Sequence, residues 1–207
     1  MTEPKEPEAM TEKQRRILDA AMEVFAERGY AGASTSEIAK RAGVAEGTIF
    51  RHYKTKKDLL IGIVAPVFFR FAAPQLLEEV YGIFRAEYDT FEDFVRALYQ
   101  NRFAFTRKHQ RVLRIAFQEM PFHPEVRALI EETVTTRIYA EAKPLIERFQ
   151  AKGEVIDADA ASVLRVLVTL MMGFAITRFL IAPDRKWEDE KELELTILVA
   201  VQGLRPR

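Results

Sequence analysis

The segment over 34–58 constrains the fold of this chain more than any other stretch. Ser34 and Glu37 fit the S/T-x-x-E capping box, so a helix is expected to begin directly after Ser34. Gly43 follows the apolar positions of that helix, and glycine can adopt the left-handed conformation that commonly ends a helix. A second short helix is expected over 45–53. The segment therefore predicts two short helices joined by a tight turn.

Positive charge gathers in the same segment. Over 40–57 six basic residues accompany a single acidic one, Glu46, whereas the whole chain has 31 basic and 31 acidic residues. Two helices joined by a short glycine-containing turn form a helix-turn-helix, whose second helix enters the DNA major groove. Charge alone would favour a solvated helix face. The cap, the glycine, the apolar spacing and the charge together favour double-stranded DNA as a partner.

The run over 11–60 resembles the N-terminal domain of TetR/AcrR-family transcriptional regulators. Three words in the family's order carry the resemblance: ILDAAMEVFAERGY, STSEIAKRAGV and EGTIFRHYKTKKDLL. The remaining 147 residues match the family only in length and helical character. Two positions depart from the family pattern, because Ala45 replaces a frequent serine cap and Glu46 replaces a basic or polar residue. The resemblance implies a dimeric DNA-binding regulator, typically a repressor, whose second domain binds a small effector.

The expected DNA contacts follow from positions in the motif. Thr48 and Arg51 are the candidates for base edges, since arginine can bind guanine through two hydrogen bonds. Gly47 lets the helix approach the duplex closely, and Phe50 can touch a thymine methyl or a sugar. Hydroxyl groups, backbone N–H groups and basic side chains around the two helices suit phosphates. The phosphate candidates are Ser34, Thr35, Ser36, His52, Lys54, Lys56 and Lys57.

The chain as a whole is predicted to be all-α, because no alternating strand pattern appears in it. Residues 1–9 are expected to be a disordered tail, and 10–57 a three-helix domain that contains the helix-turn-helix and binds DNA. Residues 58–207 are expected to form a C-terminal helical domain for ligand binding and dimerisation. Separate helices are expected after Thr90 and over 113–117.

Proline positions are expected to shape several of these helices. Pro66 and Pro74 should kink or break the helix that begins at Lys56. Pro124 suits the first turn of a helix that continues to Phe149.

Two last helices, over 158–181 and 187–204, stand apart from the rest. The first is apolar on nearly every side, so it must be buried, either inside the subunit or against a partner. A homodimer through these two helices is preferred, because a helix-turn-helix usually reads two half-sites. The apolar run over 166–176 is shorter than the roughly 20 residues that span a bilayer. We therefore expect a soluble cytoplasmic protein with no membrane contact.

Aromatic residues concentrate in the middle of a chain that has fifteen Phe and six Tyr. A single aromatic residue more often packs in the core than lines a pocket, but the aromatic residues together are more numerous than the core of a helical bundle requires. We expect an apolar pocket between helices that binds a small hydrophobic effector, such as an acyl chain or a drug-like compound. The ligand-binding candidates are Phe68, Tyr88, Arg102, Phe103, His109, Phe117, Met120, Met171, Phe174 and Arg178.

Signs of catalysis are lacking in the sequence. There is no cysteine, and the three histidines have no metal-ligand spacing. Neither HExxH, GxSxG nor a phosphate-binding glycine loop occurs. We expect no catalytic residues, no metal and no cofactor. The alternative function is a helical carrier or sensor of hydrophobic ligands that does not bind DNA.

Overall fold

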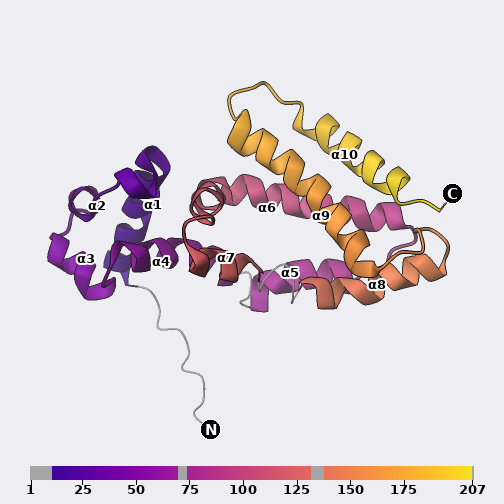
Figure 1. Ribbon diagram of the computed structural model, residues 1–207, viewed down its shortest axis with the longest axis horizontal. Helices are drawn as coiled ribbons and strands as arrows, with labels where there is room; N and C mark the ends of the chain where they lie inside the picture. Colours follow the sequence, from indigo (N-terminus) through magenta and orange to yellow (C-terminus); the bar gives the residue numbers. More distant parts are fainter. Residues whose placement is uncertain (1–10, 70–73, 132–137, 207) are drawn as a thin grey trace, which may run out of the picture.

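The computed structural model describes residues 11–69, 74–131 and 138–206, which form helices and turns with no strand (Figure 1). The all-α prediction is confirmed. The predicted disordered tail lies outside the described residues. The helices are α1 (Glu12–Gly32), α2 (Thr35–Ala42), α3 (Glu46–His52), α4 (Lys56–Phe69), α5 (Pro74–Arg85), α6 (Phe91–Glu119), α7 (Pro124–Glu131), α8 (Tyr139–Ala151), α9 (Ala160–Ile176), which a π-helical turn (Thr177–Ile181) extends, and α10 (Asp189–Gly203).

Helices α1 to α4 form a small unit at one end of the molecule (Figure 1). Thr11 and Gln14 make a complete capping box at the start of α1, and Gly29 breaks its helical backbone with φ 69°. The core of this unit is built mainly from alanine and branched aliphatic side chains, with Phe25 as its large aromatic. The small side chains let the short helices pack closely.

Helix α6 connects this unit to the rest of the molecule. The two helices predicted after Thr90 and over 113–117 are joined across a kink in α6, which runs from Phe91 to Glu119. Its backbone departs from helical geometry only at His109, with φ −112° and ψ 16°. Side chains before the kink lie in the C-terminal core, and Val112 and Ile115 lie in the N-terminal core. One helix therefore belongs to two cores.

The C-terminal core is rich in aromatic side chains from α5, α6 and α8. Phe91 and Phe149 have ring centroids 5.5 Å apart, and Phe94 lies 6.0 Å from both rings. Phe84 lies 6.0 Å from Phe94. The idea that these aromatics exceed the needs of a core is wrong for this set, because they fill the interior of the bundle.

Proline has less effect on the helices than the sequence suggested. Helix α4 continues through Pro66 to Phe69, and α8 contains Pro144. Pro74 and Pro124 occupy the first positions of α5 and α7, where the missing N–H is not needed. The helix predicted from Pro124 to Phe149 is present at both ends, as α7 and α8, and the residues between them lie outside the described part.

Helices α9 and α10 pack against α6 and against each other. Asp159 caps α9 by accepting a hydrogen bond from the Ser162 N–H. The helical stretch Ala160–Ile181 has 22 residues and is apolar enough to cross a membrane by length and composition alone. The predicted apolar run over 166–176 lies inside this stretch, and a core helix of a soluble protein can have the same length and composition. A third of its most apolar window is buried within the chain.

Candidate DNA-binding surface and effector region

The turn between α2 and α3 has the geometry that the sequence predicts. The Ser34 hydroxyl accepts a 3.2 Å hydrogen bond from the Glu37 N–H at the start of α2. Gly43 ends the helix in the left-handed conformation, with φ 65° and ψ 39°. The Val44 N–H then donates to the Ala39 carbonyl at 3.0 Å. This turn fixes where α3 begins.

Helix α3 presents one face to the core and the other to solvent. Ile49 is buried, and Tyr53 packs so closely on α4 that a Cβ at Gly62 would lie 2.8 Å from its ring. Arg51 and His52 are exposed, as is Lys54 just after the helix. Phe50 is 45% exposed, which is unusual for a large apolar side chain in a small domain. Thr48 is half-buried, and Gly47 has open space around it.

The first turns of α2 and α3 are joined by a side-chain hydrogen bond. The Thr35 hydroxyl donates to a Glu46 carboxylate oxygen at 2.5 Å. This hydroxyl proton is therefore engaged within the protein, and Glu46 lies at the start of the exposed helix. Ser36 stays exposed on the same turn of α2. Ala45 supplies no side-chain cap to α3, as the sequence predicts.

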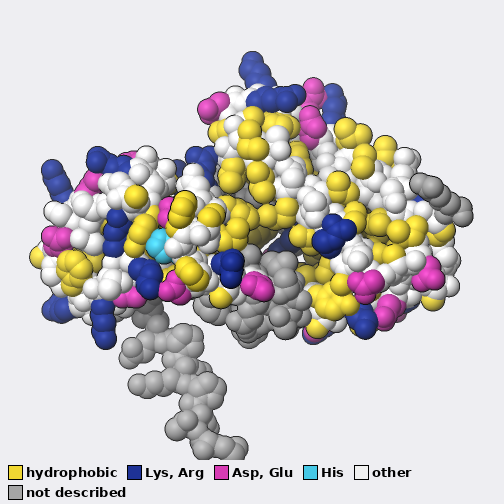
Figure 2. Space-filling model, viewed as in Figure 1, with side chains coloured by type: hydrophobic (Ala, Val, Ile, Leu, Met, Phe, Trp, Pro, Cys, Tyr) yellow, Lys and Arg dark blue, Asp and Glu magenta, His cyan; other side chains and the backbone are white. Residues whose placement is uncertain are grey.

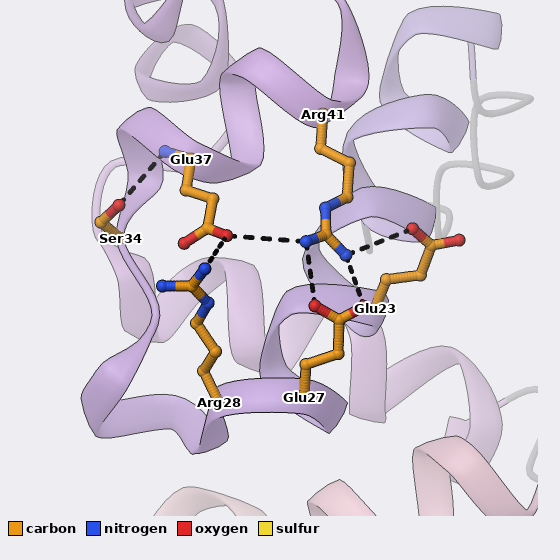
Figure 3. Close-up of polar contacts among 6 residues, drawn as sticks. All are labelled: Glu23, Glu27, Arg28, Ser34, Glu37 and Arg41. Carbon is orange, nitrogen blue, oxygen red and sulfur yellow. Dashed lines mark hydrogen bonds and ion pairs between the residues drawn. The ribbon is translucent and has the colours of Figure 1, made fainter.

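Arg41 is tied into an acidic network rather than left free (Figure 3). Its guanidinium makes two hydrogen bonds to Glu27 of α1, at 2.7 and 2.9 Å, and also lies near Glu23 and Glu37. Arg28 joins the network through Glu37 at 2.9 Å. The hydrogen bond to Glu27 raises the pKa of Arg41. Arg41 thus holds α2 against α1.

The two lysines at the start of α4 differ in their surroundings. The Lys56 ammonium lies 4.5 Å from the Tyr30 ring centroid and donates to the Ala31 carbonyl. Lys57 forms a 2.7 Å ion pair with Glu125 of α7. This pair raises the pKa of Lys57 and lowers that of Glu125. Within the described chain, no carboxylate lies within ion-pair distance of Lys40, Arg51, Lys54 or Lys56.

A second contact joins the N-terminal unit to the end of α6. The Tyr30 N–H donates to a Glu119 carboxylate oxygen at 3.3 Å, and the Tyr30 ring lies 4.6 Å from the His123 ring in an edge arrangement. His123 Nε2 is 3.5 Å from the other Glu119 oxygen. Sequence reasoning missed this junction. The four-residue spacing of Glu119 and His123 is visible in the sequence, but Tyr30 lies 89 residues away from Glu119.

The predicted ligand-binding residues fall into separate places. Phe103 stacks on Phe174 with ring centroids 5.4 Å apart, and Met171 is buried in the same core. Met120 instead packs against the N-terminal core. Arg178 is engaged by Asp189 at 2.7 Å. Tyr88 packs at the edge of the aromatic core, Phe117 is half-buried near the end of α6, and the Phe68 side chain lies outside the described part.

Arg102 and His109 lie at i and i+7 on α6, with Phe105 between them. The Arg102 guanidinium lies 5.1 Å from the Phe105 ring, and that ring lies 4.6 Å from the His109 ring. Burial lowers the pKa of Arg102 to about 10 and also lowers the pKa of His109. Candidate polar groups therefore meet in the middle of α6.

An apolar surface covers the outer side of α10. Leu195, Leu198 and Val199 are each about half exposed, at 56%, 49% and 50%, and their i, i+3, i+4 spacing puts them on one face. Ile181 at the end of the π-helical turn is 72% exposed. Figure 2 shows yellow side chains gathered over the α9 and α10 end of this view. Contiguous exposed apolar side chains usually mark an interaction surface.

A helix-turn-helix unit with an exposed basic helix, attached to a larger helical bundle, is an arrangement typical of DNA-binding regulators. Residues 17–63 match the family model described as bacterial regulatory proteins, tetR family. The fatty acid metabolism regulator protein of Bacillus subtilis is 53% identical over 51 residues, which are 25% of this chain and 26% of the relative. The repressor KstR of Mycobacterium tuberculosis is 38% identical over 66 residues, 32% of this chain and 30% of the relative. These matches thus span only about a quarter to a third of the curated relatives.

Solved structures match over most of the chain. PfmR from Thermus thermophilus superposes with a TM-score of 0.72 at 18% identity, covering 92% of this chain and 100% of that one. FadR from Bacillus subtilis in complex with stearoyl-CoA has a TM-score of 0.65 at 23% identity, covering 92% and 99%. Identities this low show a shared fold. Residues 17–63 therefore match the tetR family of bacterial regulatory proteins, and the chain shares the fold of solved TetR-family regulators.

Proposed function

We propose that the chain is a cytoplasmic repressor that binds a palindromic DNA operator as a homodimer and is released by a small hydrophobic effector. The observation that carries the proposal is the solvent face of α3, where Arg51, His52 and Lys54 are exposed beside a partly exposed Phe50. Exposed cations next to an apolar side chain suit phosphates and a thymine methyl. The carrier alternative would leave this face without a partner.

The DNA contacts follow from this face. Arg51 and Thr48 are assigned to base edges, and Gly47 allows close approach because nothing lies near the site of its absent Cβ. Ser34, Ser36, His52, Lys54 and Lys56 are assigned to phosphates. Thr35 retains its backbone N–H for that purpose, since its hydroxyl proton is engaged by Glu46. Lys57 reaches a phosphate only when it leaves Glu125.

Dimerisation is assigned to α9 and α10. The exposed apolar face around Leu195, Leu198 and Val199 would be covered by the same face of a second copy, as a twofold interface requires. Two recognition helices could then reach half-sites about one helical turn, or a multiple of it, apart.

The effector is assigned to the C-terminal domain, next to Phe103, Met171 and Phe174. The FadR structure is a complex with stearoyl-CoA, which supports an acyl-type ligand for this chain. An effector changes DNA binding only if it prefers one arrangement of the recognition helices. The contacts of Tyr30 with Glu119 and of Lys57 with Glu125 connect the two parts of the chain and are suited to transmit that preference.

Selection of random duplex DNA by the purified protein, read by sequencing, tests the proposal. We expect a palindromic enriched site and binding that weakens steeply with salt, because phosphate contacts release counterions. An added acyl compound should then reduce binding to that site. Absence of enrichment at low salt, both without ligand and with added acyl compounds, would falsify the repressor function and favour the carrier.

A further inference from the structure

Arg102 has unusual surroundings for a charged side chain. Its side chain is partly buried on α6, and its Nε donates to the Asn101 side-chain oxygen at 2.9 Å. Nη2 donates to the same oxygen. The other neighbour is the face of the Phe105 ring. In the described part of the chain no carboxylate reaches ion-pair distance of this guanidinium, and Glu79 of α5 acts on it only from farther away.

Three other arginines of the same domain are paired with carboxylates. Arg85 pairs with Glu141, Arg96 with Glu92 and Glu194, and Arg178 with Asp189. Removing a cation from water without a matching anion costs free energy, and an opposite charge recovers part of it. A neutral amide and an aromatic ring offer Arg102 only weak compensation. The site is therefore electrostatically suited to receive an anion from outside the chain.

The neighbours of Arg102 indicate what accompanies that anion. Phe105 at i+3 and His109 at i+7 lie on the same side of α6, and their rings are in contact. Burial and the nearby Lys108 lower the pKa of His109, so the imidazole is neutral near pH 7. One positive group followed by aromatic rings matches an anionic group joined to an apolar chain.

The position of the site along α6 places it where it can influence the N-terminal unit. His109 is the point where α6 leaves helical geometry. Phe103, before that point, belongs to the C-terminal core, and Val112, after it, belongs to the N-terminal core. A group bound between Arg102 and His109 would thus lie at the boundary of the two cores.

We propose that Arg102 binds the anionic group of an amphiphilic effector, a carboxylate or phosphate attached to a long apolar chain, beside the α6 kink. The proposal rests on the proposed function in placing the effector in the C-terminal domain. It adds that the effector is charged, which residue recognises the charge, and where along α6 the charge lies.

Binding of three probes that share one chain tests the charge requirement. The probes are palmitate, palmitoyl-CoA and the neutral hexadecanol, each titrated into the purified full-length protein by calorimetry. We expect at least one anionic probe to bind about tenfold more tightly than hexadecanol, the scale of one charge-assisted hydrogen bond. A preference for palmitate indicates carboxylate recognition, and a preference for palmitoyl-CoA indicates its phosphates. Equal binding of all three, or no binding of any, overturns the proposal.

Substitution of Arg102 separates a ligand-binding role from a structural one. Arg102→Met keeps the length of the side chain and removes its charge. It should lose the preference for the anionic probe and leave hexadecanol binding unchanged, while Arg102→Lys should keep part of the preference. The thermal midpoint of Arg102→Met should equal or exceed that of the wild type, because a poorly compensated cation has been removed. A lower midpoint with an unchanged preference would contradict the assignment.

Arg111→Met is the matched control, since Arg111 is exposed on the same helix. It changes net charge equally and should bind all three probes as the wild type does. DNA binding is measured separately, without ligand. Duplex binding by both the wild type and Arg102→Met, with release by the anionic probe only in the wild type, would support both proposals. If the wild type fails to bind duplex DNA but still prefers the anionic probe, the repressor function is wrong and the Arg102 site is supported.

Discussion

The N-terminal unit and the C-terminal domain differ in how they accommodate positive charge. In the first, Arg51 and Lys54 are exposed without a carboxylate partner in the described part of the chain, and water solvates them at little cost. In the second, Arg85, Arg96 and Arg178 are paired with carboxylates, and Arg102 is partly buried without such a partner among the described residues. A cation on the surface is stable without a bound ligand, because water solvates it. A free cation in the interior is costly until an anion binds.

The two cores also differ in the size of their side chains and the length of their helices. The N-terminal core is small and aliphatic, and its helices are short, so their positions depend on caps, the glycine turn and the Arg41 network. The C-terminal core is aromatic and spans long helices. The first is suited to hold a fixed surface against DNA, and the second has bulkier side chains around the region where we propose that the effector binds.

The largest expected effect tests whether the two cores unfold separately. Phe25→Ala should reduce the free energy of unfolding by roughly 3–5 kcal/mol, because it leaves a cavity in the small core. Trp187 is the single tryptophan and lies in the C-terminal domain, so its fluorescence reports that domain. We expect far-UV circular dichroism to change before the fluorescence does during thermal unfolding. Phe122→Ala, at a 76% exposed site, is the control and should change stability by about 0.5 kcal/mol or less. Coincident transitions in Phe25→Ala would show that α6 joins the cores into one cooperative unit.

The next effect concerns the exposed cations of α3. Arg51→Ala should lose roughly 1–3 kcal/mol of discrimination between operator bases, if its guanidinium reads a guanine. Competition binding with single-base variants of the selected operator measures this loss. Arg111→Ala, which removes an exposed charge from α6, should leave discrimination intact. An unchanged sequence preference in Arg51→Ala would mean that the residue binds phosphate or nothing.

Substitutions at two glycines of the helix-turn-helix distinguish effects on protein stability from effects on DNA binding. Gly43→Ala should cost about 1–2 kcal/mol, because φ of 65° is strained for an L side chain. Gly47→Ala should leave stability equal or raise it by about 0.5–1 kcal/mol, since the position is helical and its surroundings are open. The same substitution should weaken operator binding if α3 approaches the duplex closely. Thermal unfolding and a binding titration on both variants check the pair, and normal operator binding by Gly47→Ala would refute the close approach.

The smallest effect concerns the ion pair between the two parts of the chain. Glu125→Gln releases Lys57 for a phosphate, so the salt dependence of DNA binding should steepen by about one unit of slope. Lys57→Gln should leave the slope of the wild type nearly unchanged, because Glu125 already engages that ammonium. Lys57 lowers the pKa of Glu125 below 4.5, so the pair persists at neutral pH and is lost as the pH falls through that lowered pKa. A flatter slope in Lys57→Gln would show that Lys57 contacts DNA despite the pair.

The sequence by itself determined the features that depend on neighbours along the chain. The cap at Ser34, the left-handed Gly43, the uncapped Ala45 and the burial of Ile49 all follow from spacing of a few residues, because helix starts and ends are local hydrogen-bonding problems.

Only the tertiary structure decided the contacts between distant residues. It pairs Lys57 with Glu125 and Tyr30 with Glu119, and it leaves Arg102 without a carboxylate partner among the described residues. It also places the two predicted helices on either side of the His109 kink in α6, one part in each core. Such contacts depend on how whole helices pack, and helical periodicity fixes which face is apolar but not which partner covers it.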